Sequence, residues 1–381
     1  MVETEEARKR SFLVGIRDEK MRISEADSLL KELSNLSNTL GLEIASMETV
    51  HLRENHAKYG MGSGKAEELA QKAKELEVDC IVFDREISPS QQRNWEELTG
   101  IPVVDRQELI IQIFASRART REAELQVRLA DLIYSLPRLQ HKYIDLSRQR
   151  GGRYGTRGSG ETRLETDRRR VEKHIHQLED ELEILKRQRQ VQRKKRERSG
   201  IPVCALVGYT NAGKSSILNT LTGAGVLAED KLFATLDSTS RRLHLPLGTE
   251  VLLVDTVGFI RRLPHSLIKA FRSTLEEASR ASLILNVLDA SDPEAEIQYE
   301  TTLSVLRELN AGEIPMITVL NKVDRIESAS DLRSAALLNR YAGSVAVSAL
   351  KGDGLPELLA RIESSLASQK ELQNADTMNN V

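Results

Sequence analysis

Residues 203–221 read VCALVGYTNAGKSSILNTL, in which a glycine-rich loop separates an apolar, strand-like run from a helical pattern. The loop, Gly208-Tyr209-Thr210-Asn211-Ala212-Gly213-Lys214-Ser215, fits the pattern G-x-x-x-x-G-K-[ST]. Its backbone N–H groups are expected to surround phosphates at a helix N-terminus, where Lys214 would reach the β and γ oxygens and Ser215 would ligate Mg²⁺. This stretch predicts a nucleotide-binding α/β domain.

A second motif follows about 40 residues later. Asp255-Thr256-Val257-Gly258 stands directly after the apolar run Val251 to Val254. A carboxylate at this strand end could hold Mg²⁺ through water, and the Gly258 N–H could meet the γ-phosphate. A four-residue pattern of this kind also occurs in ordinary turns, so it indicates a nucleotide site only in combination with the phosphate loop.

A third set of residues points to the base. Asn321-Lys322-Val323-Asp324 ends the apolar run Met316 to Leu320. A carboxylate there would accept hydrogen bonds from the N1–H and 2-amino groups of guanine, a donor pair that adenine lacks. With adenine bound, the carboxylate would stay unpaired at a cost in free energy, so guanine should be preferred. Ser348-Ala349-Leu350 follows another apolar run and could offer a backbone N–H to guanine O6. The order of motifs resembles the translation-factor-like class of GTPases.

The segment between the first two motifs should carry the switch threonine that completes Mg²⁺ coordination. Two threonines are available there, Thr235 and Thr239, and spacing does not choose between them. Many GTPases follow D-x-x-G with a glutamine that orients the attacking water, and this chain has Phe259. Because phenylalanine cannot polarise water, we expect slow intrinsic hydrolysis that a partner stimulates.

The rest of the chain supplies two further domains. Residues 1–118 alternate short β-type runs with helical stretches, as in a small parallel sheet covered by helices. Residues 119–199 show two apolar seams of helical period, separated by the glycine-rich loop 151–160, which predicts a long antiparallel helical hairpin that Pro137 should kink or break. Residues 200–367 form the expected P-loop GTPase domain, and residues 368–381 a flexible tail. The predicted fold class is therefore α/β with these three parts.

Charge is distributed unevenly along the 381 residues. Residues 137–199 contain 19 Lys and Arg against 10 Asp and Glu, a net charge of +9, which leaves −11 for the remainder. A solvated hairpin would explain this, but arginines within a glycine loop favour contact with RNA phosphates. The two cysteines, Cys80 and Cys204, lie far apart in apolar runs, and the acidic N-terminus shows no export signal, so we expect a cytoplasmic protein without a disulfide framework.

Several motifs together resemble the HflX family of GTPases. They are FATLD at 233–237, DTVGF at 255–259, GTRGSGET at 155–162, ETDRRR at 165–170, GMGSGK at 60–65 and VFD at 82–84. The resemblance covers residues 10 to 365 and implies that Thr235 is the switch threonine. It also implies that Phe233, Ala234, Thr235, Leu236 and Asp237 belong to the GTP/GDP site and that Phe259 replaces the catalytic glutamine.

The resemblance further implies binding to the large (50S) ribosomal subunit, with rRNA contacted through the basic hairpin and its loop, and ribosome splitting, rescue or biogenesis as the outcome. We expect the free protein to be monomeric, with the hairpin closing on itself. Two alternatives remain: an ATP-driven RNA-remodelling protein that uses the N-terminal domain, and a slowly hydrolysing, nucleotide-sensing ribosome anchor. The first depends on Gly60–Lys65, which is one residue short of a phosphate loop and more simply opens a helix.

Overall fold

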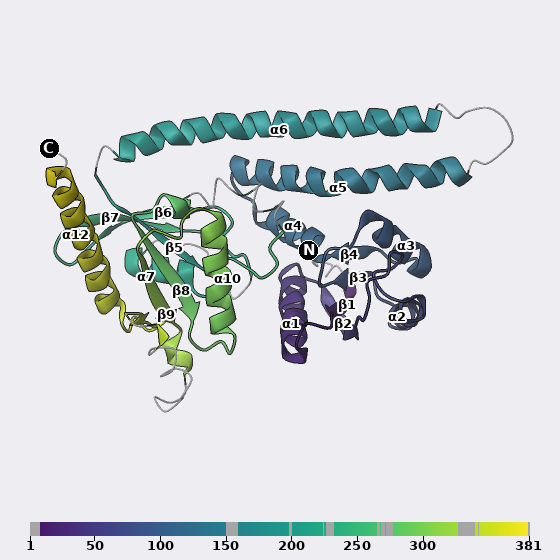
Figure 1. Ribbon diagram of the computed structural model, residues 1–381, viewed down its shortest axis with the longest axis horizontal. Coiled ribbons are helices and arrows are strands. Elements are labelled where there is room, and N and C mark those ends of the chain that lie inside the picture. Colours follow the sequence, from purple (N-terminus) through teal and green to yellow (C-terminus); the bar gives the residue numbers. More distant parts are fainter. Residues whose placement is uncertain are drawn as a thin grey trace, which may run out of the picture. The chain divides into compact units, whose positions relative to one another are not determined.

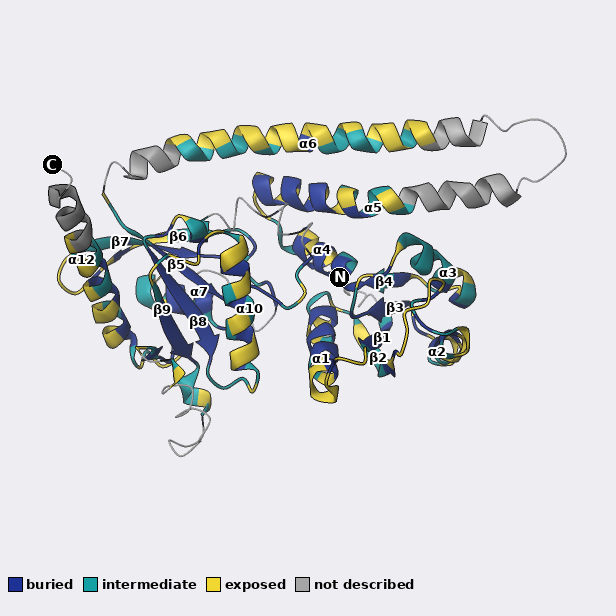
Figure 2. Ribbon diagram, in the orientation of Figure 1, coloured by how far each residue is buried: buried dark blue, intermediate teal, exposed yellow. Residues whose placement is uncertain are grey.

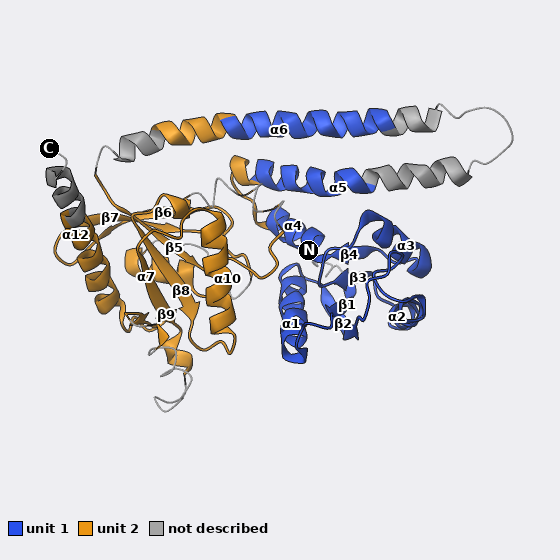
Figure 3. Cartoon of the chain, in the orientation of Figure 1, with its two compact units in different colours: residues 1–116, 124–183 blue, residues 117–123, 184–381 orange. Residues whose placement is uncertain are grey.

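A computed structural model describes residues 8–149, 159–197, 200–223, 225, 232–264, 267, 271, 277–326, 340–341 and 343–379. The chain divides into two compact units, which are coloured separately in Figure 3. The first contains residues 1–116 and 124–183, and the second contains residues 117–123 and 184–381. The expected hairpin region 119–199 is therefore shared between the two units instead of forming a third.

The first unit opens with a parallel α/β domain (Figure 1). Its elements are β1 (Arg10–Arg17), α1 (Ile23–Thr39), β2 (Glu43–His51), α2 (Ser63–Glu75), β3 (Cys80–Phe83), α3 (Pro89–Thr99), β4 (Val103–Asp105) and α4 (Arg106–Arg117). The four strands are all parallel, in the order β2-β1-β3-β4. Trp95, fully buried on α3, packs against Phe83 and Tyr59 and donates its indole N–H to the Tyr59 carbonyl.

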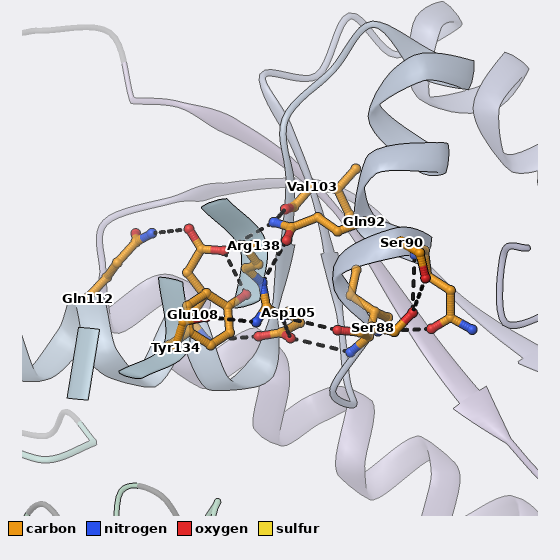
Figure 4. A network of polar contacts seen from close by, with 11 residues as sticks. Ser88, Ser90, Gln92, Val103, Asp105, Glu108, Gln112, Tyr134 and Arg138 are labelled. Atoms are coloured by element: carbon orange, nitrogen blue, oxygen red, sulfur yellow. Dashed lines mark hydrogen bonds and ion pairs between the residues drawn. The ribbon is translucent and has the colours of Figure 1, made fainter. Parts of the chain in front are cut away.

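A buried polar network fixes the part of the next helix, α5 (Arg121–Gln149), that belongs to the first unit (Figure 4). Arg138 of α5 pairs with the fully buried Asp105 at 3.0 Å and donates to the side chain of Gln92. Tyr134, one turn earlier, donates to Glu108 at 3.0 Å and lies under the Arg138 guanidinium. Burial raises the pKa of Asp105 and of Glu108, and the Arg138 charge opposes that rise at both carboxyls.

The helical segment differs from expectation in two ways. α5 passes through Pro137 as one helix, and α6 (Ser159–Glu197) already includes Ser159 and Gly160 of the expected loop. Residues 150–158 lie outside the described part of the chain. Arg189 near the end of α6 pairs with Glu122 near the start of α5 at 2.7 Å, so the two helices run antiparallel as predicted. Figure 2 shows that most residues of α6 whose burial is described are exposed or half-buried.

The second unit is a mixed six-stranded sheet with helices (Figure 1). Its strands are β5 (Val203–Gly208), β6 (Thr239–His244), β7 (Glu250–Asp255), β8 (Leu283–Asp289), β9 (Met316–Asn321) and β10 (Val345–Ala346), and its other described elements are α7 (Lys214–Thr222), α10 (Ala295–Glu308), the 3₁₀ turn η1 (Val323–Arg325) and α12 (Leu355–Asn379). The order is β10-β9-β8-β5-β7-β6, in which β6 is antiparallel to β7 and the other pairings are parallel.

The parallel strands of this unit bring the sequence motifs to one edge. β5, β7 and β9 end at Gly208, Asp255 and Asn321, and carboxyl ends of parallel strands share one edge of a sheet. α12 continues to Asn379, so residues 368–379 of the expected flexible tail are helical. Among the described helices, none combines the length and apolar character needed to cross a bilayer. The predicted fold class is confirmed.

Candidate functional site

The loop between β5 and α7 has a backbone that requires glycine at both ends. Gly208 has φ +141°, and a Cβ there would lie 2.2 Å from the Val287 carbonyl oxygen. Gly213 has φ +96°, and a Cβ there would lie 2.1 Å from the Nδ2 atom of Asn321. The loop can therefore approach β8 and β9 closely only without side chains at these positions. α7 begins directly after it, so its first N–H groups point at this edge of the sheet.

Lys214 is buried at the start of α7. Its ammonium donates to the carbonyls of Gly208 at 3.2 Å and Tyr209 at 2.8 Å, so it folds back over the loop. Burial lowers the pKa of Lys214 to about 8, and the nearby charge of Asp255 opposes that shift. A buried cation at the mouth of a loop of backbone N–H groups provides a site for phosphate oxygens.

Three oxygen-bearing side chains meet beside this lysine. The Ser215 hydroxyl donates to Asp255 at 2.6 Å and lies 2.8 Å from the Thr235 hydroxyl, which itself donates to Asp255 at 3.1 Å. Burial raises the pKa of Asp255, whose other carboxylate oxygen, Oδ1, is buried and has no hydrogen-bond partner among the described residues. Two hydroxyls and an incompletely satisfied carboxylate form a donor set that fits Mg²⁺.

The structure distinguishes the two candidate switch threonines. Thr235 lies against Ser215 and Asp255, whereas Thr239 begins β6 and is paired in register with Asp255 of β7. Phe233 and Leu236 are buried on either side of Thr235. The Asp237 side chain bonds instead to the start of α5, accepting from the backbone N–H and the hydroxyl of Thr120.

The strand end after Asp255 lies against the phosphate loop. The Thr256 hydroxyl donates to the carbonyl of Leu206 at 2.7 Å. A Cβ at Gly258 would lie 2.7 Å from Thr210 Cα and 3.0 Å from Lys214 Nζ, so this backbone is in close contact with the loop. Val257 is buried, and Phe259 is 1% exposed and is hydrogen-bonded through its backbone to Gly208 and Thr210.

The third motif is joined to the phosphate loop by one side chain. Asn321 donates to the carbonyl of Ala212 at 2.9 Å and accepts from the N–H of Ala349 at 3.1 Å. Lys322 has φ +63° and pairs with Asp289 at 2.8 Å, and Val323 begins η1. Asp289, at the end of the apolar run 283–289, was missed by the motif search although its position at a strand end offered a signal.

Asp324, the last residue of the third motif, is hydrogen-bonded to Ser348. The Ser348 hydroxyl donates to Asp324 at 2.6 Å, and this hydrogen bond lowers the pKa of the Asp324 carboxyl. Leu350 is 85% exposed, so its contribution would be through its backbone. Within Ser348-Ala349-Leu350, the Ala349 N–H donates to the side chain of Asn321, and the expected contact of this segment with guanine O6 stays a prediction.

A small cavity unites the first two motifs and the switch segment. Its lining includes ten of the predicted residues and also Ser216, which the sequence motifs did not indicate: Thr210, Asn211, Gly213, Lys214, Ser215, Ser216, Phe233, Ala234, Thr235, Thr256 and Gly258. Leu236, Asp237 and Val257 do not line this cavity, and neither do the base-motif residues 321–324 and 348–350.

A phosphate loop, a converging Ser–Thr–Asp cluster and an N-K-x-D strand end on a six-stranded α/β sheet define a P-loop GTPase. Family models agree along most of the chain: "GTP-binding GTPase N-terminal" matches residues 27–115, "GTP-binding GTPase Middle Region" matches 117–196, and "50S ribosome-binding GTPase" matches 203–322. The chain belongs to the GTPase HflX family, and the resemblance seen in the sequence is confirmed.

Two relatives illustrate the extent of the similarity. GTPase HflX of Akkermansia muciniphila is 47% identical over 369 residues, covering 94% of this chain and 84% of the relative. GTPase HflX of Escherichia coli is 42% identical over 340 residues, covering 89% and 79%. A crystal structure of SsGBP with GDP has a TM-score of 0.50 at 24% identity and covers 95% of this chain and 99% of that one, which shows a shared fold.

Proposed function

We propose that this GTPase binds the large ribosomal subunit in the cytoplasm and couples GTP binding and hydrolysis to ribosome splitting, rescue or biogenesis. The observation that carries the proposal is the combination of the nucleotide site with a long exposed basic helix in one chain. α6 has 39 residues, and Arg169 and Arg170 on it are 75% and 77% exposed. The family description "50S ribosome-binding GTPase" supports the same partner.

The nucleotide roles follow from the geometry of the cavity. Lys214 and the N–H groups of residues 209–215 bind the phosphates, since that lysine is buried beside the loop. Ser215 and Thr235 would hold Mg²⁺, with Asp255 acting through water, and the hydrogen bonds that bring the three side chains together support this assignment. When bound, the ion neutralises charge on the β and γ oxygens. The Gly258 N–H donates to the γ-phosphate of GTP, so the position of the segment after Gly258 depends on whether that phosphate is present.

Guanine selection rests with Asp324. Its carboxylate accepts one hydrogen bond from Ser348 and keeps the second oxygen for the N1–H and 2-amino donors of guanine. The lowered pKa keeps this group ionised, and hence an acceptor, at neutral pH. Asn321 acts by tying the phosphate loop to the segment 348–350.

Slow intrinsic hydrolysis follows from Phe259. The side chain at the position after D-x-x-G is buried and apolar, so it cannot orient a water molecule. A partner that orders residues around Thr235 and Gly258, or supplies a polar group, would accelerate the reaction by about 10³- to 10⁵-fold if it acts as other activating groups do. The large ribosomal subunit is the partner proposed for this role.

The arginines of α6 are suited to phosphate contacts. Arg168, Arg169 and Arg170 pair with acidic side chains three or four residues away on the same helix. Exposed pairs of this kind contribute little to stability, so a phosphate can replace the carboxylate at little cost. Binding should then depend strongly on salt, because counterions leave the RNA as each phosphate is neutralised.

The structure is more compatible with one of the two alternative functions than with the other. Phe259 also suits an anchor that senses the nucleotide, binds ribosomes and barely hydrolyses GTP. An ATP site at Gly60–Lys65 is less favoured, since Lys65 pairs with Glu48 at 2.9 Å and Glu68 at 2.7 Å, and the segment opens α2 after Gly62. The carboxylates around this lysine would repel a phosphate.

The test is GTP turnover with and without purified large subunits across a salt series. We expect stimulation of at least tens-fold that weakens as salt rises, with Lys214→Ala as the blank. Replacing Arg168, Arg169 and Arg170 together by Gln should lower the salt dependence of binding by about 2 to 3 units of slope. The matched control replaces the exposed Lys20, Arg22 and Lys31 by Gln and should change nothing. Tight GTP binding without stimulation would exclude activation by the large subunit and leave the sensing anchor or a different activator.

A further inference from the structure

The Asp237 side chain connects the switch segment to the first helix of the hairpin. Its Oδ2 atom accepts from the N–H groups of Arg119 and Thr120, each at 3.3 Å, and its Oδ1 atom accepts from the Thr120 hydroxyl. All of these residues belong to the second compact unit. The carboxylate is therefore bound to the start of α5 by three hydrogen bonds across more than a hundred residues of sequence.

The Thr120 hydroxyl has two partners at once. It donates to Asp237 and accepts from the N–H of Ala123 at 3.2 Å, which makes it the N-cap of α5. A carboxylate next to the N-terminus of a helix also gains from the helix dipole, and hydrogen bonds to an ionised acceptor are stronger than neutral ones. The contact thus joins the capping of α5 to the position of Asp237.

Asp237 lies two residues after Thr235, whose hydroxyl is 2.8 Å from that of Ser215. On its other side, Thr239 begins β6 and pairs with Asp255 at the end of β7. The short segment between these residues is thus held at one end by the sheet and in its middle by α5. Leu236, between the two functional side chains, is buried and 3% exposed, which limits independent movement of Thr235 and Asp237.

We propose that Asp237 is a positioning residue for GTP hydrolysis, and that with Thr120 it couples the start of the helical hairpin to the switch threonine Thr235. While the contact holds, Thr235 faces Ser215 and Asp255. A displacement of the start of α5 moves Asp237 with it. The fraction of molecules in which Thr235 faces Ser215 and Asp255 then changes. Because such coupling is reciprocal, occupation of the site by GTP also stabilises the first turn of α5.

The inference depends on the GTPase activity alone and not on the identity of the ribosomal partner. Thr120 does not line the nucleotide cavity. A change in hydrolysis caused by a substitution there is therefore indirect, and the double-mutant cycle with Asp237 distinguishes the contact with Asp237 from the loss of the α5 cap. This separates the coupling from any direct role of residues 233–237 in nucleotide binding.

The experiment compares Thr120→Val with Thr120→Ser in the full-length chain. Valine keeps the shape and removes both hydrogen bonds of the hydroxyl, whereas serine keeps them. We expect Thr120→Val to lower kcat for GTP three- to tenfold and to weaken GTP binding relative to GDP by a similar factor, since the switch threonine matters only with the γ-phosphate. GDP affinity should stay unchanged, and Thr120→Ser should restore both values.

A double-mutant cycle with Asp237→Asn isolates the pair. The combined Asp237→Asn, Thr120→Val variant should be no worse than the more affected single variant. Thr301→Val on α10, which also removes a hydroxyl bonded within a helix, is the matched control and should behave as wild type. Wild-type kcat and GTP/GDP preference in Thr120→Val would overturn the proposal. So would equal losses of GTP and GDP affinity, or effects of the two substitutions that simply add.

Discussion

The side-chain amide of Asn321 donates a hydrogen bond to the carbonyl of Ala212 at 2.9 Å, so the end of β9 supports the phosphate loop directly. The same side chain accepts from Ala349 at 3.1 Å. One buried residue thus connects the phosphate loop to the segment that follows β10. The base and phosphate ends of the nucleotide site are linked through protein groups before any ligand contributes.

Asn321→Ala should therefore weaken binding of GTP and GDP alike. The substitution leaves the buried Ala212 carbonyl and Ala349 N–H without their partner, at a cost of about 1 to 3 kcal/mol for each group left unpaired. We expect at least a tenfold rise in Kd for both nucleotides, measured by calorimetry. A selective loss of GTP with GDP binding intact would contradict this role, because Asn321 bonds to Ala212 and Ala349 and does not line the cavity that contains Thr235.

Asp324→Asn should change which base is accepted. The amide presents an N–H₂ donor that matches the O2 carbonyl of xanthine, while guanine presents its 2-amino donor at the same place. We expect GTP affinity to fall by about 10²-fold or more and XTP affinity to rise above it. Ser348→Ala is the comparison, since it removes only the partner of Asp324 and should weaken GTP without favouring XTP.

Gly258→Ala should impair GTP turnover while leaving GDP affinity nearly unchanged. An added Cβ would lie 2.7 Å from Thr210 Cα, a backbone atom that cannot turn away, and 3.0 Å from Lys214 Nζ. The strand end must then shift, which moves the Gly258 N–H from the proposed γ-phosphate position. Turnover should fall at least tenfold while GDP affinity changes little. Gly312→Ala in the same unit is the control for glycine replacement, because Gly312 does not have a left-handed φ and an added Cβ would lie at an ordinary 3.6 Å from the Arg307 side chain.

Much of this architecture was predictable because its signals are local. The buried strands are nearly continuous apolar runs, and Gly208 to Ser215 specify their own backbone. β6 was missed, since its sequence TSRRLH has the exposed polar residues of an edge strand. α5 continues through Pro137 because the surrounding packing, including Tyr134 and Arg138, holds the helix on both sides of it. The contact of Asp237 with Thr120 spans more than a hundred residues, and no local pattern reports it.

The cysteines should report the unfolding of each compact unit separately. Burial raises the pKa of Cys80 to about 11 and that of Cys204 to about 12, so both thiols stay protonated at pH 8 and unreactive. A thiol reagent should label the native protein slowly and the denatured protein at once. GDP should slow labelling of Cys204, on β5 before the phosphate loop, and leave Cys80 unaffected. Cys80→Ala and Cys204→Ala variants assign the two rates, and equal protection of both would show that the units open together.

Arg138→Met should destabilise the first unit in a pH-dependent way. Removing the guanidinium leaves the buried carboxylate of Asp105 without its charge partner, which typically costs about 3 to 5 kcal/mol. Burial already raises the pKa of Asp105, and loss of Arg138 raises it further. The folded state then binds a proton at pH values where the unfolded chain has released it. Stability is therefore retained below the unfolded pKa of about 4 and is lost as pH rises through the higher folded pKa.

The loss in free energy of unfolding relative to wild type should accordingly be largest at pH 7 and should shrink as pH falls toward 4. Urea unfolding at several pH values, followed by the fluorescence of Trp95 in the same unit, measures it. Asp105→Asn combined with Arg138→Met removes the buried charge and should recover much of the loss at pH 7. A deficit that is the same at every pH would mean that Arg138 stabilises α5 through its hydrogen bonds to Gln92 and the backbone, and not through the charge of Asp105.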